Sequence, residues 1–189
     1  DRKLNTKKNQ QMTKQRSNKK NSRTSPQDYI TNWLKTFVEV PHPVFGNMPP
    51  CPFAQKARLQ GQIFFRTIQD EEPDSNCWTW IDRHDFDKHE VLCMILPGTR
   101  WKPDYTRKVA VQLNSVYMKK DIVVLEDHPK IKEQVKGVSL SNGKYILLLA
   151  QRLSKLNRFS RQLTNTNYYN NWTKKHLAEV VKWRDQKSS

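Results

Sequence analysis

A proline-rich segment, residues 41–61, constrains the fold of this chain more than any other feature. It contains five of the ten prolines and two of the five glycines. Pro49, Pro50 and Pro52 fix their own φ angles and offer no backbone N–H, so the segment cannot form an internal strand. Cys51 lies among these prolines, just before a short helical pattern. We therefore predict a stiff loop that carries a thiol to the start of a helix.

Basic residues are concentrated at the amino-terminal end. Residues 1–24 contain nine Lys and Arg and one acid, Asp1, which is +8 of the formal net charge of +16. Only Leu4 and Met12 are large apolar side chains there, so burial cannot offset the entropy lost on ordering. We predict a disordered basic arm over residues 1–24 and a single α/β domain over residues 25–189.

A basic arm of this kind attracts nucleic acid or another polyanion, and salt weakens that attraction. The alternative is a solubilising tail, because blocks of like charge are often only solvated. If the arm binds nucleic acid, the contacts are expected from its central basic residues, Lys7, Lys8, Lys14, Arg16, Lys19 and Lys20.

The cysteines and the absence of long apolar runs indicate a soluble, cytoplasmic protein. Cys51, Cys77 and Cys93 are an odd number without C-x-x-C spacing, which favours a reducing compartment over a disulfide framework. A secretory signal requires an apolar segment after its basic residues, and none follows them here. No apolar run approaches the roughly 18 residues that a membrane span needs.

Periodicity predicts an α/β or α+β fold with a single sheet of about four strands covered by helices. Helical patterns begin at Ser25, Phe53, Asp104, Ser154 and Thr173, with Ser25, Ser154 and Thr173 as caps. Strand patterns cover residues 62–68, 91–96, 121–125 and 144–150. A helix between the second and third strands makes a parallel crossover the default there.

Chemistry is expected where the third strand ends, at Glu126-Asp127-His128-Pro129. In the catalytic interpretation Cys51 is a nucleophile, His128 is its base, and Asp127 or Glu126 orients the imidazole ring. A helix start also favours the thiolate form of Cys51. In the structural interpretation Asp127 caps backbone donors in a turn, His128 packs on an aromatic ring, and Cys51 fills a packing gap.

The segment His84–Glu90 holds five potential metal ligands in seven residues, but its spacing predicts no metal site. His84 and His89 point to opposite faces of a strand and are five apart on a helix, so neither geometry joins them. We interpret the segment as a charged turn. No pattern identifies a cofactor.

Three features together resemble an uncharacterised α/β domain family that carries a Cys-Pro-Phe-Ala motif and occurs in bacteria and marine phages. They are the Trp33-Leu34 helix followed by Pro50-Cys51-Pro52-Phe53-Ala54, the His128-Pro129 segment, and Gln151-Arg152-Leu153-Ser154. The resemblance covers residues 28–184 and implies a fold and a motif set, carried here by Cys51, Pro52, Phe53 and His128. It implies no reaction. Pro50 and the basic arm depart from the family pattern.

Two classes of function follow. The first is a small intracellular enzyme or ligand-binding domain, with a small-molecule site between the Cys51 loop and residues 126–129. The alternative is a non-enzymatic accessory protein that binds nucleic acid or an acidic partner through the arm and the basic C-terminal helices. The basic residues of those helices are Arg152, Lys155, Arg158, Arg161, Lys174, Lys175 and Lys182.

Overall fold

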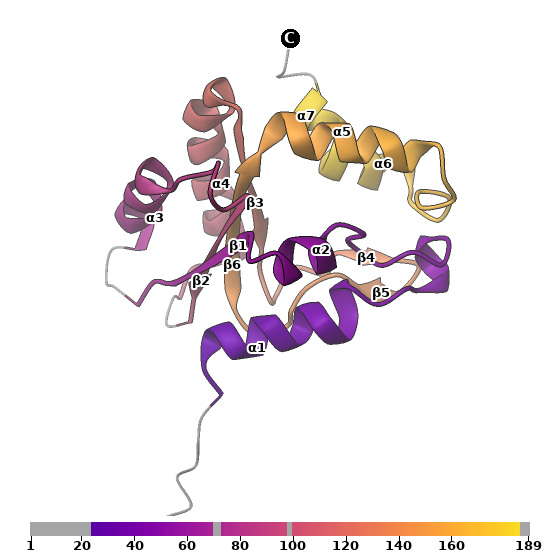
Figure 1. Ribbon diagram of the computed structural model, residues 1–189, viewed down its shortest axis with the longest axis horizontal. Coiled ribbons are helices and arrows are strands. Elements are labelled where there is room, and N and C mark those ends of the chain that lie inside the picture. Colours follow the sequence, from indigo (N-terminus) through magenta and orange to yellow (C-terminus); the bar gives the residue numbers. More distant parts are fainter. Residues whose placement is uncertain (1–23, 70–72, 98–99, 186–189) are drawn as a thin grey trace, which may run out of the picture.

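The computed structural model describes residues 24–69, 73–97 and 100–185. The predicted basic arm, with all six of its candidate nucleic-acid-binding residues, therefore lies outside the described residues apart from Thr24. In the described chain, one four-stranded sheet is covered by helices on both faces (Figure 1). This architecture confirms the predicted fold class.

The main sheet has the strand order β1-β2-β6-β3. Its strands are β1 (Ile63–Thr67), β2 (Val91–Leu96), β3 (Ile122–Asp127) and β6 (Ile146–Arg152). β1 and β2 are parallel, whereas β6 lies antiparallel between β2 and β3. β2 and β3 thus run in the same direction, as predicted, but β6 separates them. The short strands β4 (Gln134–Val135) and β5 (Val138–Ser139) pair with each other in the connection from β3 to β6.

Seven α-helical segments are found in the described chain. They are α1 (Pro26–Trp33), α2 (Ala54–Leu59), α3 (Pro73–Arg83), α4 (Pro103–Tyr117), α5 (Leu153–Thr164), α6 (Lys174–Leu177) and α7 (Trp183–Asp185). α1 continues as a π-helical turn, Leu34–Val38, and a second π-helical turn, Ala178–Lys182, joins α6 to α7. Short 3-10 turns occupy Pro43–Phe45 and Met118–Lys120. Within the described ranges, no helix is long and apolar enough to cross a bilayer.

Helix α3 is absent from the sequence-based prediction, which places no helical pattern between the strands at residues 62–68 and 91–96. Its buried residues, Cys77 and Ile81, have the i, i+4 spacing of one helical face, but exposed charges such as Asp82 and Arg83 conceal the pattern. Parallel neighbouring strands require a crossover connection, and α3 supplies it between β1 and β2.

The sheet face covered by α3 and α4 has a densely packed core. Leu92, Met94 and Leu148 project from the sheet and are fully buried. Val109 and Leu113 of α4, four residues apart and thus on one side of the helix, belong to the same buried cluster. Cys77 and Ile81 of α3 belong to the same buried cluster, so the two helices fill this face together.

The opposite face is covered by α1, α2 and α5, which come from distant parts of the chain (Figure 1). Ile30 of α1 is buried against Cys93 and Leu147 of the sheet. The predicted cap of α1 is confirmed, because the Ser25 hydroxyl accepts a hydrogen bond of 3.0 Å from the Asp28 amide. This face is the one that contains the candidate site.

The proline-rich segment is held by the loop that follows α5. The Tyr168 hydroxyl donates a hydrogen bond to the carbonyl of Pro50, and the Tyr168 ring stacks on Phe45 with centroids 5.7 Å apart. Gly46 has a φ of +65°, and a Cβ at this position would lie 2.8 Å from backbone atoms of Asn167. Only glycine fits this close approach, so the two loops are locked together.

The start of α5 corrects one predicted cap. The helix begins at Leu153, and Ser154 lies inside it rather than capping it. The cap comes from Asp121, whose carboxylate accepts from the Ser154 amide at 2.7 Å and from the Ser154 hydroxyl at 2.6 Å. The cap at Thr173 is confirmed, because its hydroxyl accepts from the His176 amide at 3.0 Å.

The two edges of the main sheet differ. At the β3 edge, the Asn114 side chain of α4 binds the backbone of Val124 twice, donating to its carbonyl and accepting from its amide at 2.8 Å each. The side chain thereby takes the place of one residue of a neighbouring strand. β1 is the strand at the opposite edge.

Candidate functional site

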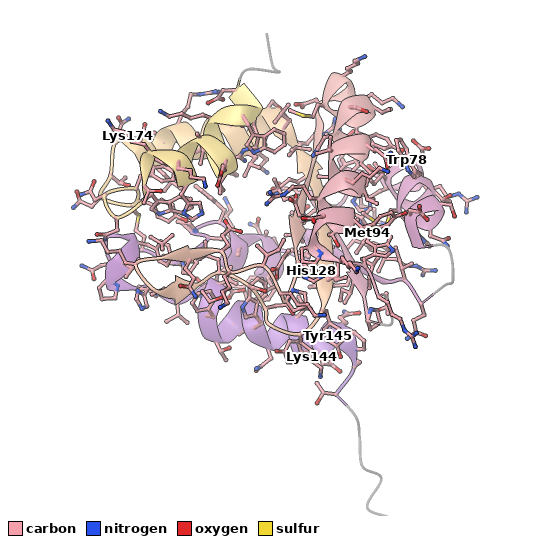
Figure 2. All side chains as sticks on the ribbon, turned by 180° about the vertical axis from the view of Figure 1, so that it is seen from behind. Trp78, Met94, His128, Lys144, Tyr145 and Lys174 are labelled. Carbon is pink, nitrogen blue, oxygen red and sulfur yellow. The ribbon has the colours of Figure 1, made fainter. Side chains whose placement is uncertain are left out.

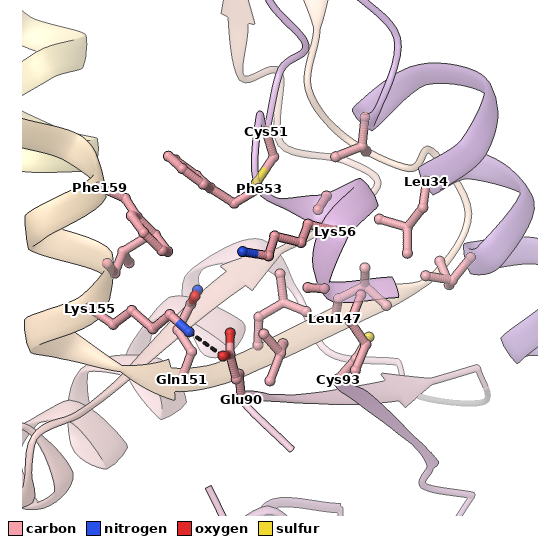
Figure 3. Close-up of a pocket in the computed structure, with 18 of the residues that line it drawn as sticks. Leu34, Cys51, Phe53, Lys56, Glu90, Cys93, Leu147, Gln151, Lys155 and Phe159 are labelled. Atoms are coloured by element: carbon pink, nitrogen blue, oxygen red, sulfur yellow. Dashed lines mark ion pairs between the residues drawn. The ribbon is translucent and has the colours of Figure 1, made fainter. Parts of the chain in front are cut away.

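A pocket of about 460 Å³ lies on the sheet face that α1, α2 and α5 cover (Figure 3). Its floor consists of side chains from three adjacent strands, namely Ile63, Phe65, Val91, Cys93, Leu147 and Leu149. Alternate side chains of a strand project to the same face, and the register aligns Phe65 with Cys93 and Cys93 with Leu149. The floor is therefore a continuous apolar surface.

Helical side chains form the other walls of the pocket. They come from α1 and its continuation, from α2 with the preceding residue, and from α5, and include Trp33, Leu34, Phe53, Ala57, Leu156 and Phe159. The rings of Phe53 and Phe159 stack with centroids 3.9 Å apart and planes within 10°. This contact joins the start of α2 to α5 at the pocket. The volume lies within the range of about 300–1,000 Å³ that is usual for small-molecule sites.

Polar side chains gather at one end of the pocket, which we call the mouth. It comprises Lys56, Glu90, Gln151, Arg152 and Lys155. Val91 pairs with Gln151, so the start of β2 lies beside the end of β6 and the start of α5. Glu90 and Lys155 consequently form an ion pair at the mouth, and Lys56 extends over the pocket on the same side (Figure 3).

Cys51 lies on the pocket wall, half-buried, before the start of α2. Burial raises the pKa of its thiol above the ordinary value. Backbone N–H groups of Phe53 and Ala54 lower that pKa, but burial outweighs them. The predicted shift toward thiolate is therefore not found, because a helix of only six residues offers little compensation for the desolvation of a charged sulfur.

A buried ion pair fixes the helices that surround Cys51. Arg58 of α2 donates from Nε and one terminal nitrogen to the two carboxylate oxygens of Glu39, each at 2.7 Å. Only 3% of the Glu39 side chain is exposed. The Cys51 amide also donates to the Val38 carbonyl at 3.1 Å. These bonds hold α2 in place beside the end of the α1 continuation.

His128 is not brought to Cys51. Its Nδ1 accepts from the Lys130 amide at 3.0 Å and therefore carries no proton, so its Nε2 donates to the Trp101 carbonyl, also at 3.0 Å. Both ring nitrogens are thus bound to backbone groups, and His128 is buried and does not line the pocket. Figure 2 views the molecule from the side opposite to Figure 1 and labels His128 near the middle of the molecule. Neither ring nitrogen of His128 is therefore free to act as a base toward the Cys51 thiol.

The two carboxylates next to His128 point to different neighbours. Asp127 accepts from the Asn142 amide at 3.0 Å and from the Asn142 side chain at 2.6 Å, as in the structural interpretation of this turn. Glu126 lies 3.6 Å from Arg107 of α4. Burial raises the pKa of Glu126, and Arg107 opposes that shift. Neither carboxylate lines the pocket, so residues 126–129 and the Cys51 loop do not enclose a common site.

The segment His84–Glu90 behaves as the predicted charged turn. His84 Nε2 lies 2.8 Å from the carbonyl oxygen of His89, and the Asp85 carboxylate accepts from the amides of Asp87 and Lys88. Among the described residues, no group of three or more His, Cys, Asp or Glu side chains could hold a metal ion.

The basic side chains of α5 recur every three residues along one side of the helix. A second hollow, of about 420 Å³, is lined by Asp121, Arg152, Ser154, Lys155, Arg158 and Arg161. Arg152 binds the exposed carboxylate of Asp87 at 2.7 Å, and Arg161 lies 3.6 Å from Asp185. Arg158 has no carboxylate partner among the described ion pairs. We call the four cationic residues of this hollow the α5 basic row; they are Arg152, Lys155, Arg158 and Arg161.

The mouth of the pocket is the part that the sequence did not reveal. Lys155 and Arg152 are recognised in the sequence only as basic residues of a C-terminal helix, and Glu90 only as the last residue of the charged turn His84–Glu90. Leu147, Leu149 and Gln151 alternate along β6 and so share one face of the strand. The sequence does not show this, because residues 146–150 are all apolar and both faces look alike. The pairing of Val91 with Gln151 is set by the whole sheet and has no local signal.

Comparisons with protein-family models, with curated proteins and with solved structures gave no match to this chain.

Proposed function

We propose that this protein binds a small, largely apolar molecule in the pocket between the sheet and helices α1, α2 and α5. The observation that carries the proposal is the combination of a continuous apolar floor with charged side chains that all belong to the mouth; the remaining polar amide in the lining, Gln60, is uncharged. Ligand sites are typically apolar concavities in which a few polar groups set the orientation of the ligand. The proposal keeps the predicted small-molecule partner and the Cys51 loop, but moves the site from residues 126–129 to the mouth.

Binding is favoured over thiol catalysis by the state of Cys51. A nucleophilic thiol needs a nearby base or a lowered pKa, and here burial raises the pKa of the thiol. His128 binds backbone groups through both ring nitrogens. Cys51 is therefore proposed as a wall residue that contacts the ligand.

The proposal is tested with N-phenyl-1-naphthylamine, an uncharged fluorescent probe of apolar sites. The wild-type protein is expected to give saturable, one-to-one enhancement of fluorescence. Ala57→Phe places a ring in the pocket and is expected to weaken probe binding at least tenfold, which is about 1.4 kcal/mol. Gln55→Phe adds the same ring to the exposed side of α2 and should leave binding unchanged. Equal effects of the two variants would contradict the proposal.

A second candidate function is nucleic-acid binding, favoured by the α5 basic row. The row contains four cations, and no acid occurs between Arg152 and Thr164. Cations on one helix side contact phosphates without reading sequence. Fluorescence anisotropy with a labelled DNA oligonucleotide should show binding that weakens with salt and falls at least tenfold in Arg158→Glu/Arg161→Glu. Unchanged binding by that variant would exclude the α5 basic row and leave the other basic residues as the contact, either Lys174, Lys175 and Lys182 or residues outside the described ranges, such as Lys7 to Lys20.

A further inference from the structure

We infer that the ligand of the pocket is an amphipathic anion, whose negatively charged head group replaces Glu90 as the partner of Lys155. The inference rests on the proposed ligand-binding function and specifies the chemical class of the ligand. A carboxylate and a phosphate monoester both fit as the head group, since both present anionic oxygens to a lysine.

The first argument is the separation of polar and apolar lining. The apolar floor and walls end at the mouth, where Lys56, Glu90 and Lys155 approach from three different elements of the fold (Figure 3). A ligand with one apolar body and one polar end matches this distribution. A uniformly polar ligand would gain no hydrophobic free energy from the floor, because that gain requires apolar surface on both sides of the contact.

The second argument is the sign of the charge at the mouth. Lys56, Arg152 and Lys155 line it together with a single carboxylate, Glu90. Arg152 also binds the Asp87 carboxylate, so two lysines remain for one Glu90. Lys56 has no carboxylate partner among the described ion pairs. The mouth thus has an excess of positive charge, which attracts an anion and disfavours a cationic ligand.

The third argument is that the Lys155–Glu90 pair can be exchanged at low cost. The side chains of Lys155 and Glu90 are 31% and 36% exposed, respectively. Ion pairs with this much exposure to water contribute little net stability. An anionic head group can therefore take Lys155 from Glu90, while the Glu90 carboxylate turns to water. Glu90 is accordingly a competitor of the head group.

The test measures displacement of N-phenyl-1-naphthylamine by four ten-carbon compounds: decanoate, decyl phosphate, decanol and decylamine. The anions are expected to displace the probe at concentrations at least tenfold lower than decanol, and decylamine is expected to be the weakest. The ratio of decanoate to decyl phosphate separates the two head-group chemistries. Added NaCl should weaken displacement by the anions and leave that by decanol unchanged.

Glu90→Gln gives the sharpest result, because removal of an acidic lining residue should strengthen anion binding. We expect at least a threefold gain for decanoate and no change for decanol. Lys56→Gln and Lys155→Gln should each weaken decanoate binding about three- to tenfold. Lys35→Gln makes the same charge change at an exposed residue outside the pocket and should have no effect.

Two failures can be told apart. If the probe binds but decanoate and decanol displace it equally, or if Glu90→Gln does not strengthen anion binding, the anionic ligand class is wrong and the pocket function stands. If neither the probe nor any of the ten-carbon compounds binds, the pocket function is wrong and this inference is overturned with it.

Discussion

The two faces of the main sheet are built from the same strands but are covered in different ways. On β6, Leu148 projects to the face of α3 and α4 and is completely buried, whereas its neighbour Leu149 projects to the pocket and is only half-buried. Two helices, α3 with 11 residues and α4 with 15, cover the first face. The second face is covered by α1 with 8 residues, α2 with 6 and α5 with 12. The three segments of the second face leave the pocket between them and the sheet.

The pocket face does not collapse because its cover is fixed to other parts of the fold. The Arg58–Glu39 pair holds α2, and the bond from Tyr168 to Pro50 holds the proline-rich segment. Prolines in that segment allow little backbone adjustment. An apolar cavity lowers stability, so a rigid frame that preserves one is consistent with a role in binding.

The largest expected effect compares neighbouring leucines on β6. Leu148→Ala leaves a new cavity in a filled core and should lower the free energy of unfolding by about 3–5 kcal/mol. Leu149→Ala only enlarges an existing pocket, so its cost should be about 2 kcal/mol or less. Urea denaturation of both variants measures the difference. Equal costs would show that the pocket face is as tightly packed as the other.

A smaller effect is expected from Arg58→Ala, which removes the partner of the buried Glu39 carboxylate. Loss of hydrogen bonds to a charged, buried group should cost about 1.5–3 kcal/mol. The same change should weaken probe binding in the pocket, because α2 loses its anchor. Arg83→Ala, an exposed arginine on the opposite face, serves as the control. A stable Arg58→Ala protein with unchanged probe binding would contradict the framing role of this pair.

Removing the cap side chain should lower the free energy of unfolding more for α1 than for α4, because only α1 has a side-chain cap bond. Ser25→Ala removes the hydroxyl that caps α1, at a cost of about 1 kcal/mol. Lys102 occupies the corresponding position of α4 and makes no side-chain cap bond, so Lys102→Ala should change the free energy of unfolding by less than about 0.5 kcal/mol. Thermal denaturation at fixed pH compares the two variants with wild type.

The smallest difference between the two faces is expected in the reactivity of their cysteine thiols. Cys51 on the pocket wall should react with iodoacetamide faster than Cys77, which is fully buried on the other face with a pKa raised to about 12. Because the pKa of Cys51 is also raised, its labelling at pH 7 should be slower than that of a free thiol. The rate should keep rising above pH 9.0, its ordinary pKa. Peptide mass spectrometry measures each site, and faster labelling of Cys77 would contradict the comparison.

Local patterns in the sequence predicted most of the fold. The Ser25 cap, the proline-rich loop and the apolar strands have signals within a few residues, because caps, fixed φ angles and alternation are local properties. Helix α3 was missed because charges at Asp82 and Arg83 conceal its buried side. The cap at Ser154 was wrong because its true cap, Asp121, lies 33 residues away in the chain.

The candidate site was predicted only in part. Cys51 does line the pocket, but the expected partnership with His128 depended on a distance that no local pattern encodes. The pocket depends on how three helices meet over the sheet, and its mouth depends on the register of Val91 and Gln151. Lys155 and Glu90 are 65 residues apart in the sequence, and only the antiparallel pairing of β2 with β6 brings them together.

The Asn114 side chain has a consequence for how this fold can grow. By occupying the amide and carbonyl of Val124, it blocks the middle of the β3 edge, so a further strand could not pair along the whole of β3. Additional strands, whether inserted during evolution or contributed by another chain in an aggregate, are therefore expected to join at β1. We therefore expect enlarged relatives to extend the sheet beyond β1. Loss of Asn114 would expose the Val124 amide and carbonyl and make β3 a second edge at which chains could associate.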